Sequence, residues 1–348
     1  MSKIIEGGNK GCKNCGGSIE FSPSFNCLWC EKCGSKSTII KNDYVALHEY
    51  NSTLDNPSKT TVTIRCEKCG ANVVVYNNVH AAVCPYCKSS VVLALEHMQG
   101  LKPDGIIPFA FDKNRARGLF KENIKSKWFL PNKFKKDPLI KNIKGIYIPS
   151  FSFNQLTTSS YNGRLGQNHT ATDGSGKMRT YTTYRNISGS INLDHKNIFI
   201  ESGSQISQAQ LEQIKPYDTR AFCGYNEDFV RGFSVEYYTD RLEDCKKQGD
   251  LMIDNIIRSS ILRQYQYDFV SYLNVSTSRS QETFSYLILP TYQIELTYKD
   301  KKYLTLMNGQ TGKVGSNLPR SGVKITFFVL GLLLIFLLVT LGLFFIVQ

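Results

Sequence analysis

A long apolar run near the C-terminal end constrains this chain more than any other feature. From Ile325 to Val347 the sequence contains no charged residue and no proline. At about 1.5 Å per residue, a helix of this length spans a hydrocarbon core of about 30 Å with slack for tilt. A buried core helix is the alternative, but an uninterrupted run of this length that closes a chain is rarely one. We therefore expect 325–347 to be a transmembrane helix.

The residues around this run predict its orientation. Lys313, Arg320 and Lys324 precede it, with no acidic residue between Gly312 and the run, which favours a cytosolic N-terminal side. Only Gln348 follows, so the segment would emerge after translation and act as a tail anchor. The N-terminus has no apolar segment typical of a signal peptide. The expected protein is single-pass, with its N-terminal domains in the cytosol.

In a reducing cytosol, closely spaced pairs of cysteines indicate metal ligands before disulfides, whereas in a secreted protein they would indicate disulfides first. Nine of the 11 cysteines precede residue 90, and eight of them form two CxxC…CxxC groups that are offset by 54 residues. The two groups are Cys12, Cys15, Cys30, Cys33 and Cys66, Cys69, Cys84, Cys87. Four thiolates complete a tetrahedral site, so we predict two structural zinc ions.

The sequence around the cysteines fits a pair of zinc ribbons, at about 10–38 and 64–92 within a region 1–98. A glycine after a CxxC tolerates the positive φ at which backbone N–H groups approach the thiolates. That position holds Gly16, Gly34 and Gly70, and then Lys88. The segments 18–25 and 72–79 carry strand-forming residues. Units of roughly 25 residues cannot bury enough core, so metal must stabilise them.

Cys27 forms a further CxxC with Cys30 and could be read as part of a redox motif. The repeat argues against this, because position 27 corresponds to Ala81, which is not a ligand. No βαβ pattern surrounds the pair either. We expect Cys27 to be a spare thiol.

Most of the net charge of +13 lies in one stretch, since residues 99–145 contribute +8 and residues 1–98 only +2. Two loaded four-cysteine sites would bring the N-terminal region to about −2, because Zn²⁺ with four thiolates is formally −2. Phosphate binding needs a cationic face, so this balance weakens a nucleic-acid role for the ribbons.

Within the basic stretch, 112–129 is expected to form an amphipathic helix. Its apolar positions are Ala116, Leu119, Phe120, Ile124 and Trp128. Its opposite face carries a basic stripe of Lys113, Arg117, Lys121 and Lys125, followed by Lys133, Lys135, Lys136, Lys141 and Lys144. Like charges four residues apart destabilise a helix slightly. Four interpretations of the stripe remain open: a solvated helix face, a site for anionic lipid, a docking site for an acidic protein, or a contact with nucleic acid.

The middle region, 146–320, predicts an α+β domain that is mostly β. Strands are expected at 145–153 and 287–294, each bent near a proline, and at 179–191, 197–201 and 303–307. Asp173-Gly174 and Asn308-Gly309 are candidate hairpin turns. Helices are expected at 208–214 and about 241–262, the second capped by Asp240 and Glu243. Its buried face would include Leu242, Cys245, Met252, Ile253, Ile256 and Ile257, whereas Cys223 would be an isolated thiol.

Catalytic motifs are missing from the sequence. The loop at 173–178 departs from a phosphate-binding loop, because Ala171 and Met178 stand where glycine and Ser or Thr are required. The five histidines form no HExxH, and no GxSxG occurs. We therefore expect a protein that is not an enzyme and has no small-molecule substrate.

An ordered set of motifs along the chain resembles a bacterial family of zinc-ribbon membrane proteins, the YdjG-like type. The motifs are the CxxCG knuckles, IIPF at 106–109, YIPSF at 147–151, PYD at 216–218, GFSVEYY at 232–238, NGQTGKVGS at 308–316 and the apolar end. The resemblance implies a phage-shock type of envelope-stress system at the inner membrane, with partners of the TPM-domain, SPFH-like and PspA types. Relatives are often labelled TFIIB-type zinc ribbon or primosomal protein N′-like.

Two functions from different classes follow from these features. The first is a tail-anchored scaffold whose ribbons and β-rich domain recruit protein partners in a membrane-stress response. The alternative is a membrane-tethered nucleic-acid-binding protein that uses the ribbons and 133–144, which predicts a steep dependence of affinity on salt.

Overall fold

The computed structural model describes residues 4–6, 11–50, 61–66, 69–76, 79–87, 90–92, 101–136, 138–172, 174, 176–203 and 206–347. Lys88 and Asp173, which entered the sequence predictions, lie outside these residues. The fold is α+β with a strand-rich middle, as the sequence predicted. Within the described ranges the strands form one ten-stranded sheet and two three-stranded sheets.

The strands are β1 (Ile4–Glu6), β2 (Glu20–Ser22), β3 (Cys27–Trp29), β4 (Lys36–Ser37), β5 (His48–Glu49), β6 (Thr61–Arg65), β7 (Asn72–Tyr76), β8 (Val79–Val83), β9 (Ser90–Val92), β10 (Gly105–Ile106), β11 (Leu139–Thr172), β12 (Met178–Glu201), β13 (Cys223–Gly224), β14 (Ser234–Glu236), β15 (Phe269–Tyr298) and β16 (Lys301–Asn308). The helices are α1 (Lys113–Ser126), α2 (Asn132–Lys136), α3 (Gln208–Ile214), α4 (Leu242–Leu262) and α5 (Gly322–Val347), with short 3-10 helices at Thr219–Ala221 and Glu227–Val230.

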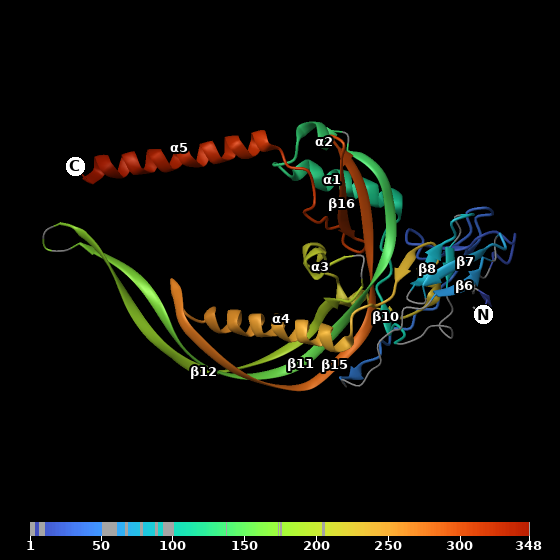
Figure 1. Cartoon of the computed structure of the whole chain (residues 1–348), viewed down its shortest axis with the longest axis horizontal. Helices are drawn as coiled ribbons and strands as arrows, with labels where there is room; N and C mark the ends of the chain where they lie inside the picture. The colour runs from blue at the N-terminus through green and yellow to red at the C-terminus, as the bar shows by residue number, and fades with distance from the viewer. Residues whose placement is uncertain are drawn as a thin grey trace.

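Three very long strands organise the large sheet. β11 pairs with β12 on one side and with β15 on the other, both antiparallel. Figure 1 shows these strands as a curved ribbon, with α4 inside the curve and the paired ends of β11 and β12 at one end. Helices α1 and α2 and strand β16 lie at the opposite end, where α5 begins and from which it extends away. The sequence predicted 179–191 and 197–201 as two strands, but β12 is continuous from Met178 to Glu201.

Strands β11 and β15 each carry a proline at the point where the strand changes neighbours. β11 pairs with β14 through Tyr147 and with β12 from Ser150 onward, so Pro149 stands between the two pairings. In β15, Pro290 stands between the pairing with β10 and the pairing with β16. A proline has no N–H to donate to a sheet ladder, and these gaps are positions where it does least harm.

Helix α4 covers the concave side of the ribbon with a less apolar face than the sequence suggested. Cys245, Ile253 and Ile257 are buried as predicted, but Ile256 is 39% exposed and Lys246 is only 5% exposed. Lys246 Nζ lies 2.7 Å from Asp250 Oδ1 and 2.5 Å from Glu282 Oε2 on β15. These two ion pairs, one within α4 and one across to the sheet, explain why a lysine occupies a core position.

Helix α4 has nearly the predicted bounds, but its predicted capping residues were wrong. The residue before α4 is Arg241, which makes no side-chain capping bond, and Glu243 instead pairs with Lys247 at 2.8 Å. The turn between β15 and β16 is Lys299-Asp300, where both residues have positive φ. A type I′ turn needs positive φ at both central positions, and Lys-Asp is not a typical sequence signal for it. The chain turns again at the predicted Asn308-Gly309, where the Asn308 amide donates to the Lys313 carbonyl oxygen at 2.9 Å and Val314 forms an antiparallel bridge with Met307.

The cysteine-rich region packs directly on the large sheet. Strand β8, from the second cysteine group, pairs with β14 and so belongs to the ten-stranded sheet. In the first group, Phe21 contacts Phe229 edge-on, with ring centroids 5.1 Å apart. Phe233 lies between the two parts, because its ring stacks on Phe109 at 4.2 Å and lies 6.4 Å from Phe21. Strands from both sides of residue 98 therefore belong to the ten-stranded sheet.

Substituting Phe233→Ala should lower the free energy of unfolding by about 3–5 kcal/mol, because it removes a buried ring that joins the first cysteine group to the sheet. Urea unfolding of the chain in detergent, followed by the fluorescence of Trp29, measures the change. Phe25→Ala is the matched control, because Phe25 is 52% exposed, and its effect should stay below about 1 kcal/mol. Equal effects of the two variants would contradict the bridging role of Phe233.

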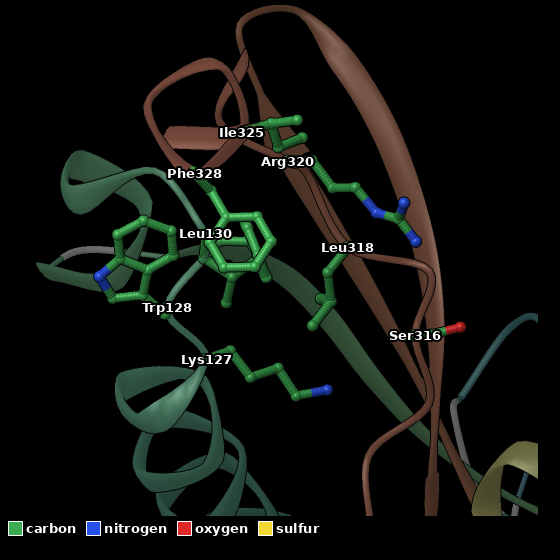
Figure 2. A pocket seen from close by; sticks show the side chains of 9 residues that line it. Lys127, Trp128, Leu130, Ser316, Leu318, Arg320, Ile325 and Phe328 are labelled. Atoms are coloured by element: carbon green, nitrogen blue, oxygen red, sulfur yellow. The ribbon is translucent and has the colours of Figure 1, made fainter. Parts of the chain in front are cut away.

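Helix α5 joins the body of the protein through a short apolar junction. The chain leaves helical geometry at Lys127, so α1 ends at Ser126 and not at 129 as predicted. Trp128 is consequently not on the apolar face of α1 but is half exposed beside Phe328 of α5 (Figure 2). Lys324 of α5 donates to the carbonyl oxygens of Trp128 and Leu130 at 3.0 and 2.9 Å.

Candidate metal centres

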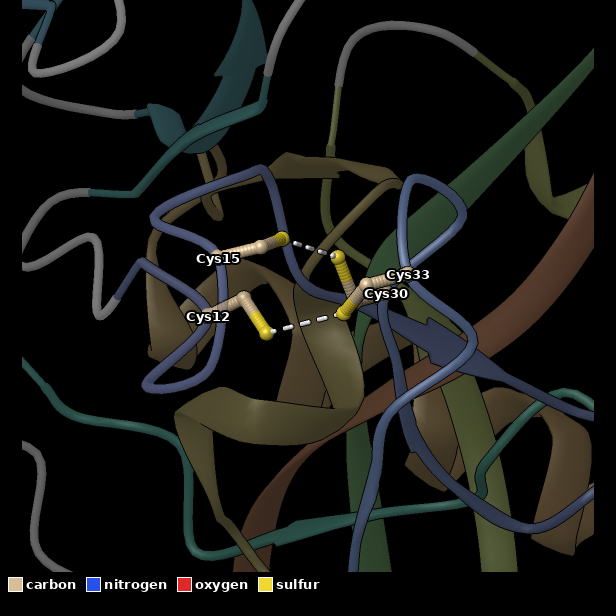
Figure 3. A group of neighbouring side chains, drawn as sticks. All are labelled: Cys12, Cys15, Cys30 and Cys33. Atoms are coloured by element: carbon tan, nitrogen blue, oxygen red, sulfur yellow. Dashed lines mark hydrogen bonds between the residues drawn. The ribbon is translucent and has the colours of Figure 1, made fainter.

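The eight predicted cysteines lie in two groups of four. In the first group, the Sγ atoms of Cys12 and Cys33 lie 3.5 Å apart, and those of Cys15 and Cys30 lie 3.6 Å apart (Figure 3). The second group repeats the arrangement, with Cys66 to Cys87 at 3.6 Å and Cys69 to Cys84 at 3.8 Å. Within each group the four sulfurs lie within 4.8 Å of one another.

The local backbone explains how each CxxC turns both sulfurs inward. Gly16, Gly34 and Gly70 have φ values of 66°, 73° and 71°, in the left-handed region that favours glycine. Each of these glycines donates its N–H to the carbonyl oxygen of the first cysteine of its CxxC, at 2.8, 2.8 and 2.7 Å. The same turn thus occurs three times among the described residues, as the repeat predicted.

Backbone amides near the sulfurs favour the thiolate form. The amides of Asn14 and Cys15 donate to Cys12 and lower the pKa of its thiol. The hydroxyl and then the amide of Ser35 lower the pKa of Cys33 to about 6. The amide of Gly17 donates to Cys15, but the neighbouring thiols raise the pKa of Cys15 to about 12. Four crowded sulfurs cannot all ionise without a cation between them, which is the electrostatic reason for a metal in each group.

The donor set fits a closed metal site. Each group offers four thiolates, with Cys12, Cys30, Cys66 and Cys84 buried. Soft sulfur donors in a tetrahedral set suit Zn²⁺ or iron, and four protein ligands leave no position open for substrate. Both groups could therefore hold a metal ion, and their composition is consistent with zinc.

The remaining cysteines lie outside both groups. Cys27 is buried in β3 and is not among the clustered sulfurs. Cys223 is buried, and this burial raises the pKa of its thiol to about 11. Cys245 is fully buried on α4, where burial and nearby carboxylates also raise its pKa. Raised thiol pKa values disfavour the reactive thiolate at Cys223 and Cys245.

The basic stripe forms one exposed row on α1. Lys113, Arg117, Lys121 and Lys125 are all exposed, whereas Ala116, Phe120 and Ile124 on the opposite face are buried. On α2, Lys133 and Lys136 are exposed, and Lys135 is half-buried and donates to the Lys125 carbonyl oxygen at 3.1 Å. No carboxylate of the described residues forms an ion pair with the four stripe residues.

A buried pair of carboxylates lies outside these sites and had no signal in the sequence. Glu201 ends β12 and Glu236 ends β14, and they are 5% and 6% exposed. They approach the backbone of Gly203 closely, since a Cβ there would lie 2.9 Å from Glu201 Oε1 and 2.8 Å from Glu236 Cδ. Burial, with repulsion from Glu236 and Asp240, raises the pKa of Glu201 to about 8.

The contribution of Glu201 to the stability of the protein should therefore fall as pH rises from 6.5 to 8. The folded state keeps a proton on Glu201 that the unfolded chain, with a pKa near 4.5, has already released. This contributes a slope of at most about 1.4 kcal/mol per pH unit. Glu201→Gln should flatten the slope when unfolding in urea is measured at both pH values. An unchanged slope in that variant would contradict the assignment.

One helix of the described residues is long and apolar enough to cross a membrane, over Gly322–Gly342 of α5. No residue of its most apolar window is buried in the rest of the protein. Its length and composition support a membrane-spanning segment at the C-terminal end.

Comparison with known proteins places the chain beside one bacterial protein. It is 26% identical over 315 residues to the uncharacterized protein YdjG of Bacillus subtilis (strain 168). The alignment covers 90% of this chain and 91% of that protein. No protein-family model matches the chain, and no solved structure does. The similarity thus extends over nearly the whole length, and the relative's name assigns no activity.

Proposed function

We propose that this chain is a non-enzymatic membrane scaffold, anchored by α5, whose zinc-loaded cysteine groups and β-rich domain recruit protein partners to the bacterial inner membrane. The observation that carries the proposal is that a single apolar helix, α5, is joined directly to the part of the protein that contains both cysteine groups and the large sheet. The body contains two closed four-cysteine sites, and α5 is joined to it by hydrogen bonds from Lys324.

The role of the metal in this proposal is mechanical. The first cysteine group contacts the sheet through Phe21, and the second contributes β8 to the sheet through its pairing with β14. Zinc in both groups would therefore hold this end of the large sheet in shape. The β11–β12 hairpin extends away from the body, and among the described residues β12 pairs with β11 alone, so its outer edge offers backbone groups to a partner.

The orientation and the partners are further parts of the proposal. Lys313, Arg320 and Lys324 precede the span, which supports a cytosolic position for the body. The resemblance to zinc-ribbon membrane proteins supports partners of the TPM-domain, SPFH-like and PspA types, in a phage-shock response.

A pull-down of the tagged full-length chain from detergent extracts tests the proposal. We expect proteins of these three types to co-purify, and to remain after nuclease treatment. The matched control is α5 fused to an unrelated soluble domain, which should retain none of them. Loss of the partners on nuclease treatment, with a steep dependence on salt, would support the nucleic-acid-binding alternative and contradict the scaffold.

A further inference from the structure

The junction between the body and α5 forms an apolar cavity of about 590 Å³ that is open on one side. Its walls come from 127–130, from 316–320 and from the first turns of α5. Figure 2 shows the ring of Phe328 at its centre, with Trp128 on one side and Leu318 on the other. This is the place where the predicted membrane span leaves the body, so the cavity lies where headgroups and acyl chains meet.

The walls of the cavity are fastened together. Lys324 Nζ donates to Trp128 O, Leu130 O and Asn132 Oδ1 at 3.0, 2.9 and 2.7 Å. The Ser321 amide donates to the Phe129 carbonyl oxygen at 2.8 Å. These bonds fix α5 against the loop between α1 and α2, so the cavity is formed before any ligand enters, which lowers the entropic cost of binding.

The charge at the cavity is positive. Lys127 and Arg320 are the charged residues of its lining, and no carboxylate of the described residues lines it. Lys127 Nζ donates to a neutral acceptor, the Gly315 carbonyl oxygen, at 3.4 Å, and its desolvation lowers the pKa of its ammonium. A half-buried cation beside a neutral acceptor favours an anionic occupant.

A second, more polar cavity of about 420 Å³ adjoins the first. The two share Ser316, Leu318 and Arg320, and the second also includes Gln213 and Asn317. Of these two cavities, the first is the one lined by residues of α5, namely Ile325 and Phe328. The apolar space therefore lies along the span and the polar space lies towards the body, which is the arrangement that an amphiphile requires.

We propose that this junction binds one anionic phospholipid, with its phosphate held by Lys127 and Arg320 and its acyl chain against Trp128, Leu318 and Phe328. The site rests on the proposed membrane anchoring by α5 but is separate from the basic stripe on α1. The bound lipid would fix the angle between α5 and the body. Aromatic residues and cations at the end of a span are the side chains that membrane interfaces favour.

Native mass spectrometry of the delipidated full-length chain in neutral detergent, titrated with phosphatidylglycerol or phosphatidylcholine, tests this site. The wild-type chain should retain one phosphatidylglycerol in preference to phosphatidylcholine. Lys127→Ala combined with Arg320→Ala should weaken retention at least about tenfold. Trp128→Ala, which keeps every charge, should also weaken it, and Trp128 is exposed enough that the fold should survive.

The matched control is Lys121→Ala combined with Lys125→Ala, which removes the same charge from the exposed stripe and should leave retention unchanged. Equal losses in the control and in the cavity variant would overturn the site in favour of bulk attraction. Equal retention of both lipids would overturn the role of the phosphate. If the wild-type chain binds a glutamate-rich peptide and no lipid, the cavity is a protein dock. A wild-type chain that is soluble in cell fractionation would instead contradict the anchor itself.

Discussion

Replacing Cys30 by serine is expected to leave one zinc ion per chain, and the wild-type chain is expected to hold two. Cys30 is fully buried and supplies one of the four sulfurs of the first group. Zinc binding to such sites is worth about 10–16 kcal/mol, which exceeds the stability of a ribbon of this size. The first group should therefore unfold, while Cys66, Cys69, Cys84 and Cys87 keep their ion.

Native mass spectrometry of the full-length chain in detergent measures the metal content, and the fluorescence of Trp29 in β3 reports whether the first group is folded. Cys27→Ser is the matched control, because Cys27 is buried only three residues away and lies outside both groups. It should keep two ions and the wild-type fluorescence. If Cys27→Ser loses an ion, or Cys30→Ser keeps two, the assignment of ligands is wrong.

The cysteine groups were predictable because their geometry is local. Two residues between cysteines, and a glycine after them, fix the turn at Gly16, Gly34 and Gly70 without help from the rest of the fold. The internal repeat then separated ligands from Cys27, since position 27 corresponds to Ala81. The span of α5 and the short helix α3 were also predictable from local sequence, because their composition and the residues that begin or end a helix define them.

The parts that sequence reasoning missed depend on distant contacts. Nothing in the local pattern shows that β8 pairs with β14, more than 150 residues later. Lys246 was missing from the predicted buried face of α4 because its partner Glu282 lies on another element. Glu201 likewise meets Glu236, from another strand, beside Gly203, and Trp128, just beyond the end of α1, lies beside Phe328 of α5. Tertiary packing overrides local propensity at each of these positions.

Replacing Leu333 and Leu337, both in the middle of α5, by arginine is expected to release the protein from the membrane. Each arginine at the centre of a span costs about 2.5–3.5 kcal/mol on insertion scales, so the pair opposes insertion strongly. Extraction of membranes with alkaline carbonate should leave the wild-type chain in the pellet and move Leu333→Arg combined with Leu337→Arg to the supernatant. Leu333→Ile combined with Leu337→Ile is the matched control and should stay in the pellet.

The basic stripe provides the contrasting case, because a spanning helix makes the four surface cations unnecessary for anchoring. Reversing Lys113, Arg117, Lys121 and Lys125 to glutamate should leave the chain in the carbonate-resistant pellet, although each cation near an anionic surface contributes about 1 kcal/mol. These residues could then only orient the body or dock an acidic partner. If the stripe reversal releases the chain while the arginine pair in α5 does not, the protein is held by surface charge, and the spanning role of α5 is wrong.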